Sequence, residues 1–336
     1  MLPNTRRLNV NDVRFFSGQS HPTLAAGIAS YLEIPLDRAV FGRFSNDNLY
    51  IQLGSSVRGR VVYIVQSLVP PVSDHLMELL MMLDIARSAG ASQVHAVIPY
   101  FSYARSDKKD APRISITARL IADLLETAGA THVMTMTLHS PQVHGFFHVP
   151  TDPLTARPLF AWHFREKHLD IDKTVVVSPD VGRAKSAGRF AERLHMPVAA
   201  ATKVRISDNE VVFDPGIERQ VGGFERALVY DDEIATGGTV LGLCKRLVES
   251  GVKEIAVICT HGVFTGDSIQ CLNDFPQITE IVTSDTVPIA PEKRTSKLTI
   301  LSVASLFGEA IWRNYTRQSI GDLYSYGDDI LDLDDE

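Results

Sequence analysis

Short apolar runs separated by helix-length segments constrain the fold of this chain more than any other feature. Six runs rich in Val and Ile lie between polar or glycine residues: Val61–Gln66, Val94–Pro99, Val133–Leu138, Thr174–Ser178, Ala227–Tyr230 and Glu254–Cys259. Continuous apolar runs of this length are typical of strands that are buried on both faces. The sequence therefore predicts sheets that are covered by helices on both sides.

The segments between these runs have the residue spacing of helices. Four of them are Asp74–Ser88, Ile116–Thr127, Ala184–Leu194 and Val240–Glu249. Three of these segments are followed by Gly90, Gly129 or Gly251, and glycine is the residue that most often ends a helix. Because a parallel crossover needs about a dozen residues, the alternation predicts an α/β, doubly wound fold with mostly parallel sheets.

The strand–helix alternation occurs twice, which indicates two domains. It runs to about residue 150 and resumes near residue 170, with the proline-containing stretch His148–Pro158 in between. A chain of 336 residues also exceeds the usual size of a single hydrophobic core. We expect domains at 1–155 and 156–320, followed by an acidic tail at 321–336, since Asp328–Glu336 carries six acids.

Composition argues against two classes of partner. The formal net charge of −7 disfavours nucleic-acid binding, which needs a surplus of Lys and Arg. The N-terminal residues lack the apolar stretch of a signal peptide, and no run approaches the ~20 apolar residues of a membrane span. Cys244, Cys259 and Cys271 form no CxxC pair, which favours reduced thiols. We expect a cytoplasmic protein with no membrane or nucleic-acid partner.

The most informative segment joins the apolar run at Ala227–Tyr230 to the following helix. Two acids are followed by a turn of small residues, in which Gly237 and Gly238 allow backbone N–H groups to approach a phosphate. Acids at the carboxyl end of a strand suit sugar hydroxyls or a metal-bound diphosphate. The predicted sugar-phosphate residues are Asp231, Asp232, Ala235, Thr236, Gly237, Gly238 and Thr239.

This segment, with two acids, three residues and then Thr-Gly-Gly-Thr, resembles the phosphoribosyl-pyrophosphate loop shared by phosphoribosyltransferases and ribose-phosphate pyrophosphokinases. Resemblance to the pyrophosphokinase family extends over nearly the whole chain. Matching segments include Phe44–Asn48, Ser56–Val61, Ile64–Ser67, His75–Leu80, Val97–Asp107, Leu138–Phe147, Val177–Asp180, Thr202–Arg205 and Thr260–Phe264. Since a simple transferase would match only the second half, the pyrophosphokinase family is favoured.

The resemblance implies two domains of phosphoribosyltransferase type and transfer of the β,γ-diphosphate of ATP to the 1-hydroxyl of ribose 5-phosphate. It implies catalytic roles for Lys203 and Arg205, a Mg²⁺ site at His139 and Asp180, and a homo-oligomer of at least two chains. No GxxxxGK[ST] sequence occurs, so ATP is expected in the first domain. The implied ATP residues are Phe44, Asn46, Asp47, Asn48, Arg105, Ser106, Asp107 and His139.

The chain departs from the common family pattern at a few positions. It has Asn46 and Asn48 where Asp and Glu are usual, Ser106 where Gln is usual, and Ala235 where Asp is usual. These departures make the base preference less certain than the reaction, and the resemblance does not by itself imply control by phosphate or ADP. Two alternatives stay open: a phosphoribosyltransferase, and a non-catalytic subunit that regulates a pyrophosphokinase.

Overall fold

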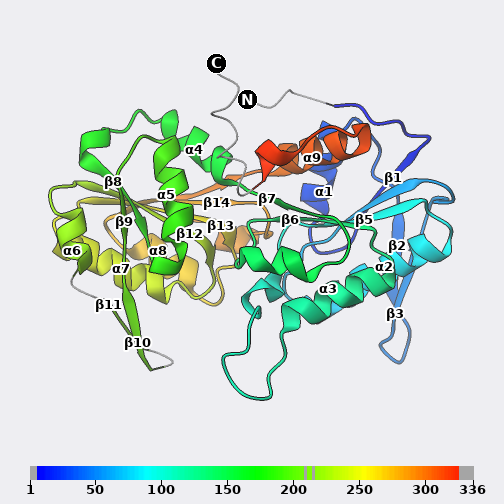
Figure 1. The fold of residues 1–336 in the computed structure, drawn as a ribbon, viewed down its shortest axis with the longest axis horizontal. Helices are drawn as coiled ribbons and strands as arrows, with labels where there is room; N and C mark the ends of the chain where they lie inside the picture. Colours follow the sequence, from blue (N-terminus) through cyan, green and yellow to red (C-terminus); the bar gives the residue numbers. More distant parts are fainter. Residues whose placement is uncertain (1–5, 208–209, 214–215, 325–336) are drawn as a thin grey trace. The chain divides into compact units, whose positions relative to one another are not determined.

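The computed structural model describes residues 6–207, 210–213 and 216–324, which pack as two compact units (Figure 1). The first unit contains the chain up to Thr155, Thr286–Pro288 and the chain from Ser302 onward, and the second contains Ala156–Asp285 and Ile289–Leu301. The expected second domain, 156–320, differs from the second unit at its C-terminal end, because residues after Leu301 pack with the first unit.

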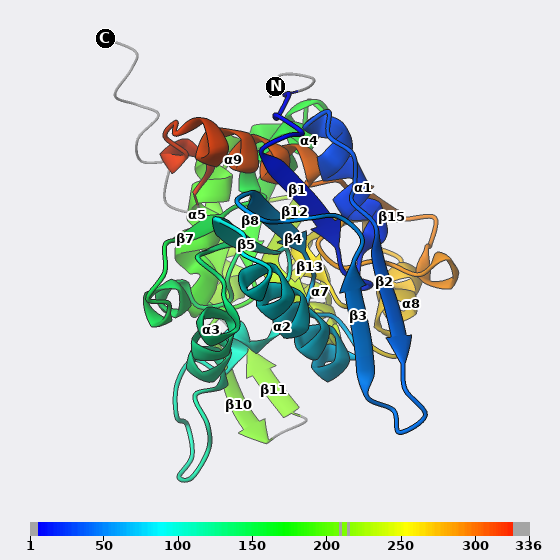
Figure 2. The ribbon, with the colours of Figure 1, turned by 90° about the vertical axis from the view of Figure 1, so that its right-hand side faces the viewer.

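A five-stranded parallel sheet forms the centre of the first unit. Its strands, in spatial order, are β1 (Val13–Ser17), β4 (Val61–Val65), β5 (Gln93–Ile98), β6 (His132–Met136) and β7 (Thr151–Leu154). Helices cover both faces of this sheet (Figures 1 and 2). They are α1 (Pro22–Tyr31) and α9 (Ala304–Thr316) on one face, and α2 (Val72–Ser88) and α3 (Thr117–Ala128) on the other.

An antiparallel hairpin, β2 (Ala39–Arg43) and β3 (Leu49–Leu53), extends from the first unit (Figure 2). Its large apolar side chains are more exposed than those of the sheet; Phe44 at its tip is 58% exposed. Short 3-10 helices in the connections of this unit are η1 (Ser102–Arg105), η2 (Pro141–Phe146) and η6 (Gly321–Leu323).

A six-stranded parallel sheet forms the centre of the second unit. Its strands, in spatial order, are β15 (Leu298–Leu301), β14 (Ile278–Ser284), β13 (Glu254–Gly262), β12 (Arg226–Ile234), β8 (Thr174–Ser178) and β9 (Val198–Ala200). An antiparallel hairpin, β10 (Lys203–Ser207) and β11 (Glu210–Phe213), follows β9. Short 3-10 helices of this unit are η3 (Ile171–Lys173), η4 (Val181–Arg183) and η5 (Pro291–Lys293).

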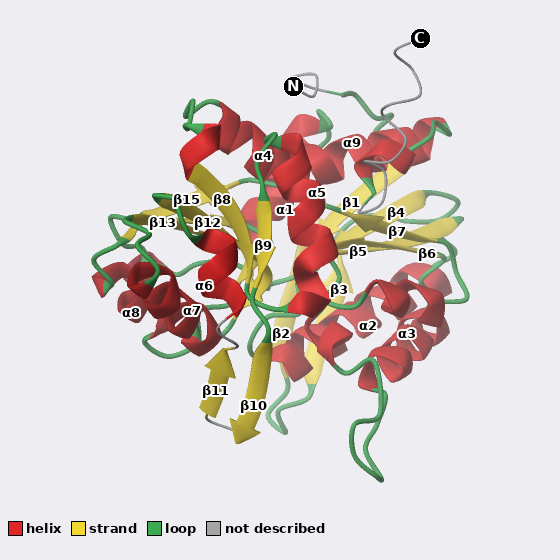
Figure 3. Cartoon of the chain, turned by 60° about the vertical axis from the view of Figure 1, so that its left-hand side comes forward, coloured by secondary structure: helices red, strands yellow, loops and turns green. Residues whose placement is uncertain are grey.

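Helices cover both faces of the second sheet. On one face lie α4 (Arg157–Arg165) and α5 (Ala184–Arg193), where the ring of Phe190 stacks on Tyr230 of β12 with centroids 4.6 Å apart. On the other lie α6 (Gly216–Val221), α7 (Gly238–Glu249) and α8 (Ser268–Asp274), which Figure 3 shows gathered on the same side. Successive side chains of β12 point to opposite faces of the sheet, so both faces are apolar and both need helices. Val229 packs in the hydrophobic cluster of α7, while Tyr230 faces α5.

The second sheet reverses its strand order between β8 and β12. From β8 the chain continues through α5 to β9 on one side, and from β12 through α7 to β13 on the other. The two strands pair only as far as Val177 and Val229, although β12 continues to Ile234. Ligands of open α/β sheets bind at such a switch point, beyond the carboxyl ends of the strands.

The predicted α/β fold with parallel, doubly covered sheets is confirmed. All five residues of β8 are buried, as a central parallel strand requires. The predicted glycine stops are also confirmed, since Gly90, Gly129 and Gly251 have φ angles of +83°, +124° and +98°. Two predicted strands were too short, because β12 and β13 continue for several residues beyond their apolar runs. No helix in the described part of the chain is long and apolar enough to cross a membrane.

Candidate active site

The loop after β12 combines a helix N-terminus with open space in front of it. Gly237 precedes α7 and has a φ of +75°, a conformation that strains any residue with a side chain. A Cβ atom added to Gly238 would meet no heavy atom within 4 Å, and both Thr236 and Gly238 are exposed. The first N–H groups of a helix have no partner within the helix and attract anions. This loop therefore has the geometry of a phosphate-binding turn.

A second segment supports this loop from behind. The N–H groups of Phe264 and Thr265 donate to the carbonyl oxygens of Ile234 and Ala235 at 3.0 and 2.9 Å. Lys293 Nζ in turn donates to the carbonyl of Phe264 at 2.7 Å. Phe264, which ends the motif Thr260–Phe264 predicted from the resemblance, and the next residue, Thr265, thus hold the backbone of the loop in place. The contact of Lys293 with this segment could not be predicted from the sequence.

Tight packing explains why residue 262, in the segment behind the loop, is a glycine. A Cβ atom added to Gly262 would approach the ring of Phe264 to 2.4 Å and Thr283 Oγ1 to 2.7 Å. No real side chain tolerates such distances, so only glycine fits there without moving the segment behind the loop.

Two neighbouring carboxylates at the end of β12 have different surroundings. Asp231 is half-buried, and its Oδ1 accepts a hydrogen bond from the N–H of Asp232 at 2.8 Å. Asp232 is only 7% exposed, and its Oδ2 lies 3.1 Å from Nη2 of Arg183. Burial, followed by the charge of Asp232, raises the pKa of Asp231 well above its ordinary value, whereas the nearby Arg183 opposes this shift.

Asp180 lies beyond the end of β8, beside the same switch point. Its Oδ1 accepts a hydrogen bond from the backbone N–H of Arg183 at 3.0 Å. Arg183 therefore contacts both Asp180 and Asp232, through its backbone and its guanidinium respectively. Arg183 was not among the predicted site residues, and its only signal in the sequence is a basic residue three positions after Asp180.

The donor set suits magnesium only in part. Mg²⁺ prefers oxygen ligands and usually keeps several waters, so the half-buried carboxylate of Asp180 is a suitable ligand. Among the described residues no group of three or more His, Cys, Asp or Glu side chains could hold a metal ion. The carboxylate of Asp180 therefore suits a Mg²⁺ ion whose other ligands are mainly substrate phosphates and water, rather than protein side chains.

The expected catalytic cations lie in β10. Lys203 pairs with Phe213 of β11 and Arg205 pairs with Val211, so the two residues are separated by one position in an extended strand. The structure describes only the backbone of these two residues. Their side chains lie outside what it describes.

The expected ATP residues occupy two places in the first unit. Phe44, Asn46, Asp47 and Asn48 form the exposed tip of the β2–β3 hairpin, where Phe44 packs edge-on against Tyr50 with ring centroids 5.7 Å apart. Figures 1 and 2 show this hairpin well separated from the loop that precedes α3. The remaining residues, Arg105, Ser106 and Asp107, begin that loop.

Within this loop, Ser106 has a structural role. Its Oγ donates to the carbonyl of Ser115 and accepts from the N–H of Thr117, both at 3.3 Å, so it closes the loop before α3. Arg105 is exposed and Asp107 is half-buried. His139 lies three residues beyond β6 and is half-buried. His139 belongs to the first unit and Asp180 to the second.

Family models match both units. A model described as the N-terminal domain of ribose phosphate pyrophosphokinase matches residues 13–129. A model described as a phosphoribosyl synthetase-associated domain matches residues 216–325, which include the loop after β12.

Relatives match nearly the full length. A relative from Streptomyces coelicolor is 48% identical over 94% of this chain and 98% of its own. The ribose-phosphate pyrophosphokinase of Deinococcus radiodurans is 43% identical over 96% of this chain and 100% of its own. The crystal structure of phosphoribosylpyrophosphate synthetase from Mycobacterium smegmatis matches with a TM-score of 0.83 and 36% identity, covering 91% of this chain and 99% of that one. The chain therefore belongs to the ribose-phosphate pyrophosphokinase family of enzymes.

Proposed function

We propose that this enzyme transfers the β,γ-diphosphate of ATP to the 1-hydroxyl of ribose 5-phosphate, giving phosphoribosyl pyrophosphate and AMP. The observation that carries the proposal is the turn at Gly237 and Gly238, with open space at Gly238 and a helix N-terminus, close to Asp231 at the switch point of the second sheet. In the reaction, the sugar oxygen bonds to the β-phosphorus, and the bond from that phosphorus to the α–β bridging oxygen breaks.

Ribose 5-phosphate is assigned to the loop. The N–H groups of Ala235–Thr239 would hold the 5-phosphate, because a helix N-terminus favours an anion. The hydroxyls of Thr236 and Thr239 add donors. Asp231 would accept hydrogen bonds from the sugar hydroxyls, since Asp232 is already paired with Arg183.

Lys203 and Arg205 are assigned to the transferring diphosphoryl group. Negative charge develops on its non-bridging oxygens, and cations positioned there lower the barrier. Arg205 has a planar fork that can bind two oxygens, whereas Lys203 is a compact point charge. Their one-position separation in β10 supports a shared role.

ATP is assigned to the tip of the β2–β3 hairpin, to Arg105, Ser106 and Asp107, and to His139. Exposed Phe44 offers a ring face on which a base can stack, and Asn46 and Asn48 offer amide groups for its edge. Asp180 and His139 would hold Mg²⁺, which supplies positive charge to the diphosphate oxygens when bound. The half-buried carboxylate of Asp180 supports its part in this assignment.

We also assign a homo-oligomer of two or more chains and a cytoplasmic location. Sedimentation at working concentration should give a mass above that of the 37.0 kDa monomer. A monomer would contradict the oligomer.

One assay tests the reaction. The protein is incubated with ribose 5-phosphate, ATP and Mg²⁺, and AMP and phosphoribosyl pyrophosphate should form in equal amounts. A phosphoribosyltransferase would instead consume phosphoribosyl pyrophosphate when a nucleobase is added, and a regulatory subunit would do neither alone. Absence of both products with ATP, GTP and CTP would refute the proposal.

A further inference from the structure

Lys293 is a cation that lies behind the loop after β12. It ends η5 and is half-buried, and its Nζ donates to the carbonyl oxygen of Phe264 at 2.7 Å. A hydrogen bond from a charged amine is shorter and stronger than one between neutral groups. The positive charge of Lys293 is therefore held against a peptide group that itself contacts the loop.

The residue that Lys293 contacts has an unusual backbone conformation. Phe264 has a φ of +41°, in the left-handed region that bulky residues rarely adopt. Consecutive N–H groups of an extended strand point to opposite sides. Here two consecutive N–H groups, those of Phe264 and Thr265, both donate to carbonyl oxygens at the start of the loop. The unfavourable conformation is thus tied to the support of the loop, as is common at functional sites.

The contacts form a continuous chain of hydrogen bonds from Lys293 to the loop. The carbonyl of Phe264, which accepts from Lys293, shares a peptide group with the N–H of Thr265. This N–H donates to the carbonyl of Ala235 at 2.9 Å, and that carbonyl shares a peptide group with the N–H of Thr236. Because the C=O and N–H of a trans peptide point in opposite directions, each group in such a chain polarises the next. The chain ends at Thr236, an exposed residue whose N–H donates to no backbone carbonyl in the described part of the protein.

We propose that Lys293 is a positioning residue for ribose 5-phosphate: through two peptide groups it fixes and polarises the N–H of Thr236, which donates to the 5-phosphate. This inference rests on the proposed binding of the sugar phosphate by the loop. Without the amine, the left-handed conformation of Phe264 would lose one of the contacts that hold it, and the donors of the loop would be less well aimed. Since the 5-phosphate does not react, Lys293 should affect binding rather than turnover.

The test uses the full-length protein and calorimetry with ribose 5-phosphate. Lys293→Met keeps the apolar stem but removes the amine, and should raise the dissociation constant about five- to tenfold. The kcat should change less than about twofold, and the KM for ATP should stay the same. Lys293→Arg keeps a charged donor, so it should bind the sugar more tightly than Lys293→Met does.

Lys297→Met is the matched control. Lys297 Nζ also donates to a backbone carbonyl, that of Phe275, at 2.9 Å, and Lys297 is half-buried like Lys293. It precedes β15, at the amino end of the parallel strands, whereas the loop follows the carboxyl end of β12. Loss of a similar hydrogen bond at this distant edge of the same sheet should leave affinity for the sugar unchanged.

Four results would overturn the inference. The first is wild-type affinity for ribose 5-phosphate in Lys293→Met. The second is an equal loss of sugar affinity in Lys297→Met, and the third is an equal loss of affinity for ATP in Lys293→Met; either would indicate a general structural role. The fourth is an affinity of Lys293→Arg no better than that of Lys293→Met, which would show that the hydrogen bond to Phe264 is not the cause.

The measurements separate this inference from the proposed function. Calorimetry uses ribose 5-phosphate alone, so a wild type that binds the sugar but forms no AMP refutes the reaction and not the role of Lys293. A wild type that forms both products while Lys293→Met binds normally refutes only the role of Lys293. If Lys293→Met fails to fold, Lys293→Gln, which also removes the charge, replaces it: weaker sugar binding supports the inference and wild-type affinity overturns it.

Discussion

Lys203 and Arg205 are the residues at which loss of one side chain should slow turnover most. Their proposed contacts are with charge that develops only in the transition state, so Lys203→Ala or Arg205→Ala should lower kcat about a hundredfold, or ~3 kcal/mol. The dissociation constant for ribose 5-phosphate should change little. Lys253→Ala is the control, because Lys253 is an exposed residue that pairs with Glu225. A raised KM for the sugar with an unchanged kcat would contradict the assignment.

Loss of the Asp231 side chain should affect substrate binding more than kcat, the opposite of what is expected for Lys203 and Arg205. A carboxylate that binds sugar hydroxyls interacts with ground state and transition state alike, so Asp231→Ala should weaken ribose 5-phosphate binding more than it lowers kcat. Calorimetry and steady-state kinetics together measure this split. Unchanged affinity for the sugar would remove Asp231 from the binding site.

The side-chain amides of Asn46 and Asn48 at the hairpin tip predict weaker discrimination between ATP, GTP and CTP. A carboxylate only accepts hydrogen bonds, whereas Asn46 and Asn48 can both accept and donate, so either an amino or a keto group on the base can be satisfied. A buried group without a partner costs about 1–3 kcal/mol, and an amide avoids part of that penalty. Asn46→Asp combined with Asn48→Glu should therefore sharpen the preference for ATP over GTP and CTP, measured as kcat/KM. If stacking on Phe44 already fixes the base, the ratio will not change, and the hypothesis fails.

At the scale of elements, the turn between β12 and α7 depends on the left-handed conformation of Gly237. With a φ of +75°, alanine at this position is strained by about 1–2 kcal/mol. Gly237→Ala should therefore lower the free energy of unfolding by about that amount and weaken ribose 5-phosphate binding as the loop shifts. Denaturant unfolding and calorimetry give the two quantities.

Gly188 provides the matched control for this substitution. It lies inside α5, and an added Cβ would meet no heavy atom within 4 Å. Gly188→Ala should raise the free energy of unfolding by about 0.5–1 kcal/mol, because alanine favours a helix, and should leave sugar binding unchanged. Equal effects of the two substitutions on binding would contradict a specific role for the turn.

Elements with a single strong pattern could be predicted from the sequence. The run Thr174–Ser178 is buried throughout and coincides with β8, and the acids and glycines after Tyr230 lie near the carboxyl end of β12 and in the turn that follows it, as expected. The β2–β3 hairpin was not predicted, because its strands are half-exposed and lack a continuous apolar run. The extension of β12 to Ile234 was also missed, since pairing with β13 overrides the acids that seemed to end the strand.

The ion pair between Arg183 and Asp232 could not be predicted for a different reason. Asp232 lies 49 positions after Arg183 in the chain, and only the adjacency of β8 and β12 brings the two together. Pairings across strands that are distant in sequence depend on topology, which residue spacing does not reveal.

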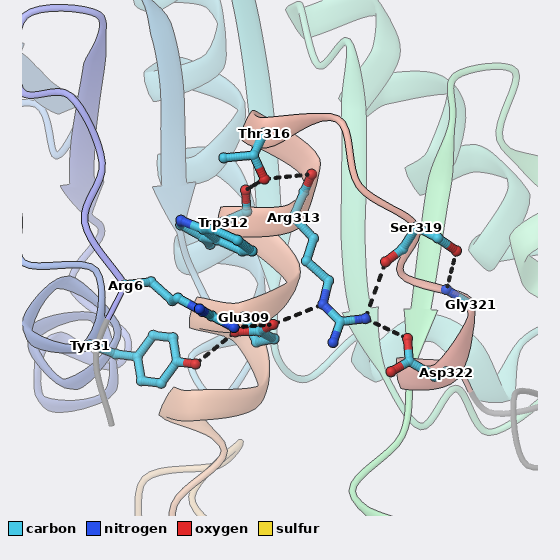
Figure 4. Close-up of polar contacts among 9 residues, drawn as sticks. All are labelled: Arg6, Tyr31, Glu309, Trp312, Arg313, Thr316, Ser319, Gly321 and Asp322. Atoms are coloured by element: carbon cyan, nitrogen blue, oxygen red, sulfur yellow. Dashed lines mark hydrogen bonds and ion pairs between the residues drawn. The ribbon is translucent and has the colours of Figure 1, made fainter. Parts of the chain in front are cut away.

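At the scale of the whole molecule, residues near both ends of the described chain pack together in the first unit. The carboxylate of Glu309 in α9 accepts hydrogen bonds from Arg6, Tyr31 and Arg313 at 3.0, 2.8 and 2.8 Å. Figure 4 shows these residues around Glu309. Arg313 also reaches Asp322 at 2.6 Å. Because the chain passes through the second unit before it returns at Ser302, this network forms only when the last helix packs against α1.

Glu309 is completely buried, so its charge depends on these partners. Burial raises its pKa, but the hydrogen bonds from Arg6, Arg313 and Tyr31 outweigh burial and leave the pKa below the ordinary value of 4.5. Glu309→Gln keeps the shape but leaves both arginines without their shared anion, and should lower the free energy of unfolding at pH 7 by about 3 kcal/mol.

The pH dependence of the difference in stability between wild type and Glu309→Gln tests whether the charge of Glu309 causes it. A carboxylate with a lowered pKa stabilises the folded state fully above its unfolded pKa, and the contribution is lost as the pH falls through the folded pKa. The gap between wild type and Glu309→Gln should therefore be constant from pH 7 to about 5 and close below pH 4.5. Glu249→Gln is the control: Glu249 is 63% exposed beside Arg246, and its loss should cost less than about 0.5 kcal/mol. A gap that persisted unchanged at pH 3 would mean that packing, and not the charge of Glu309, holds the returning helix in place.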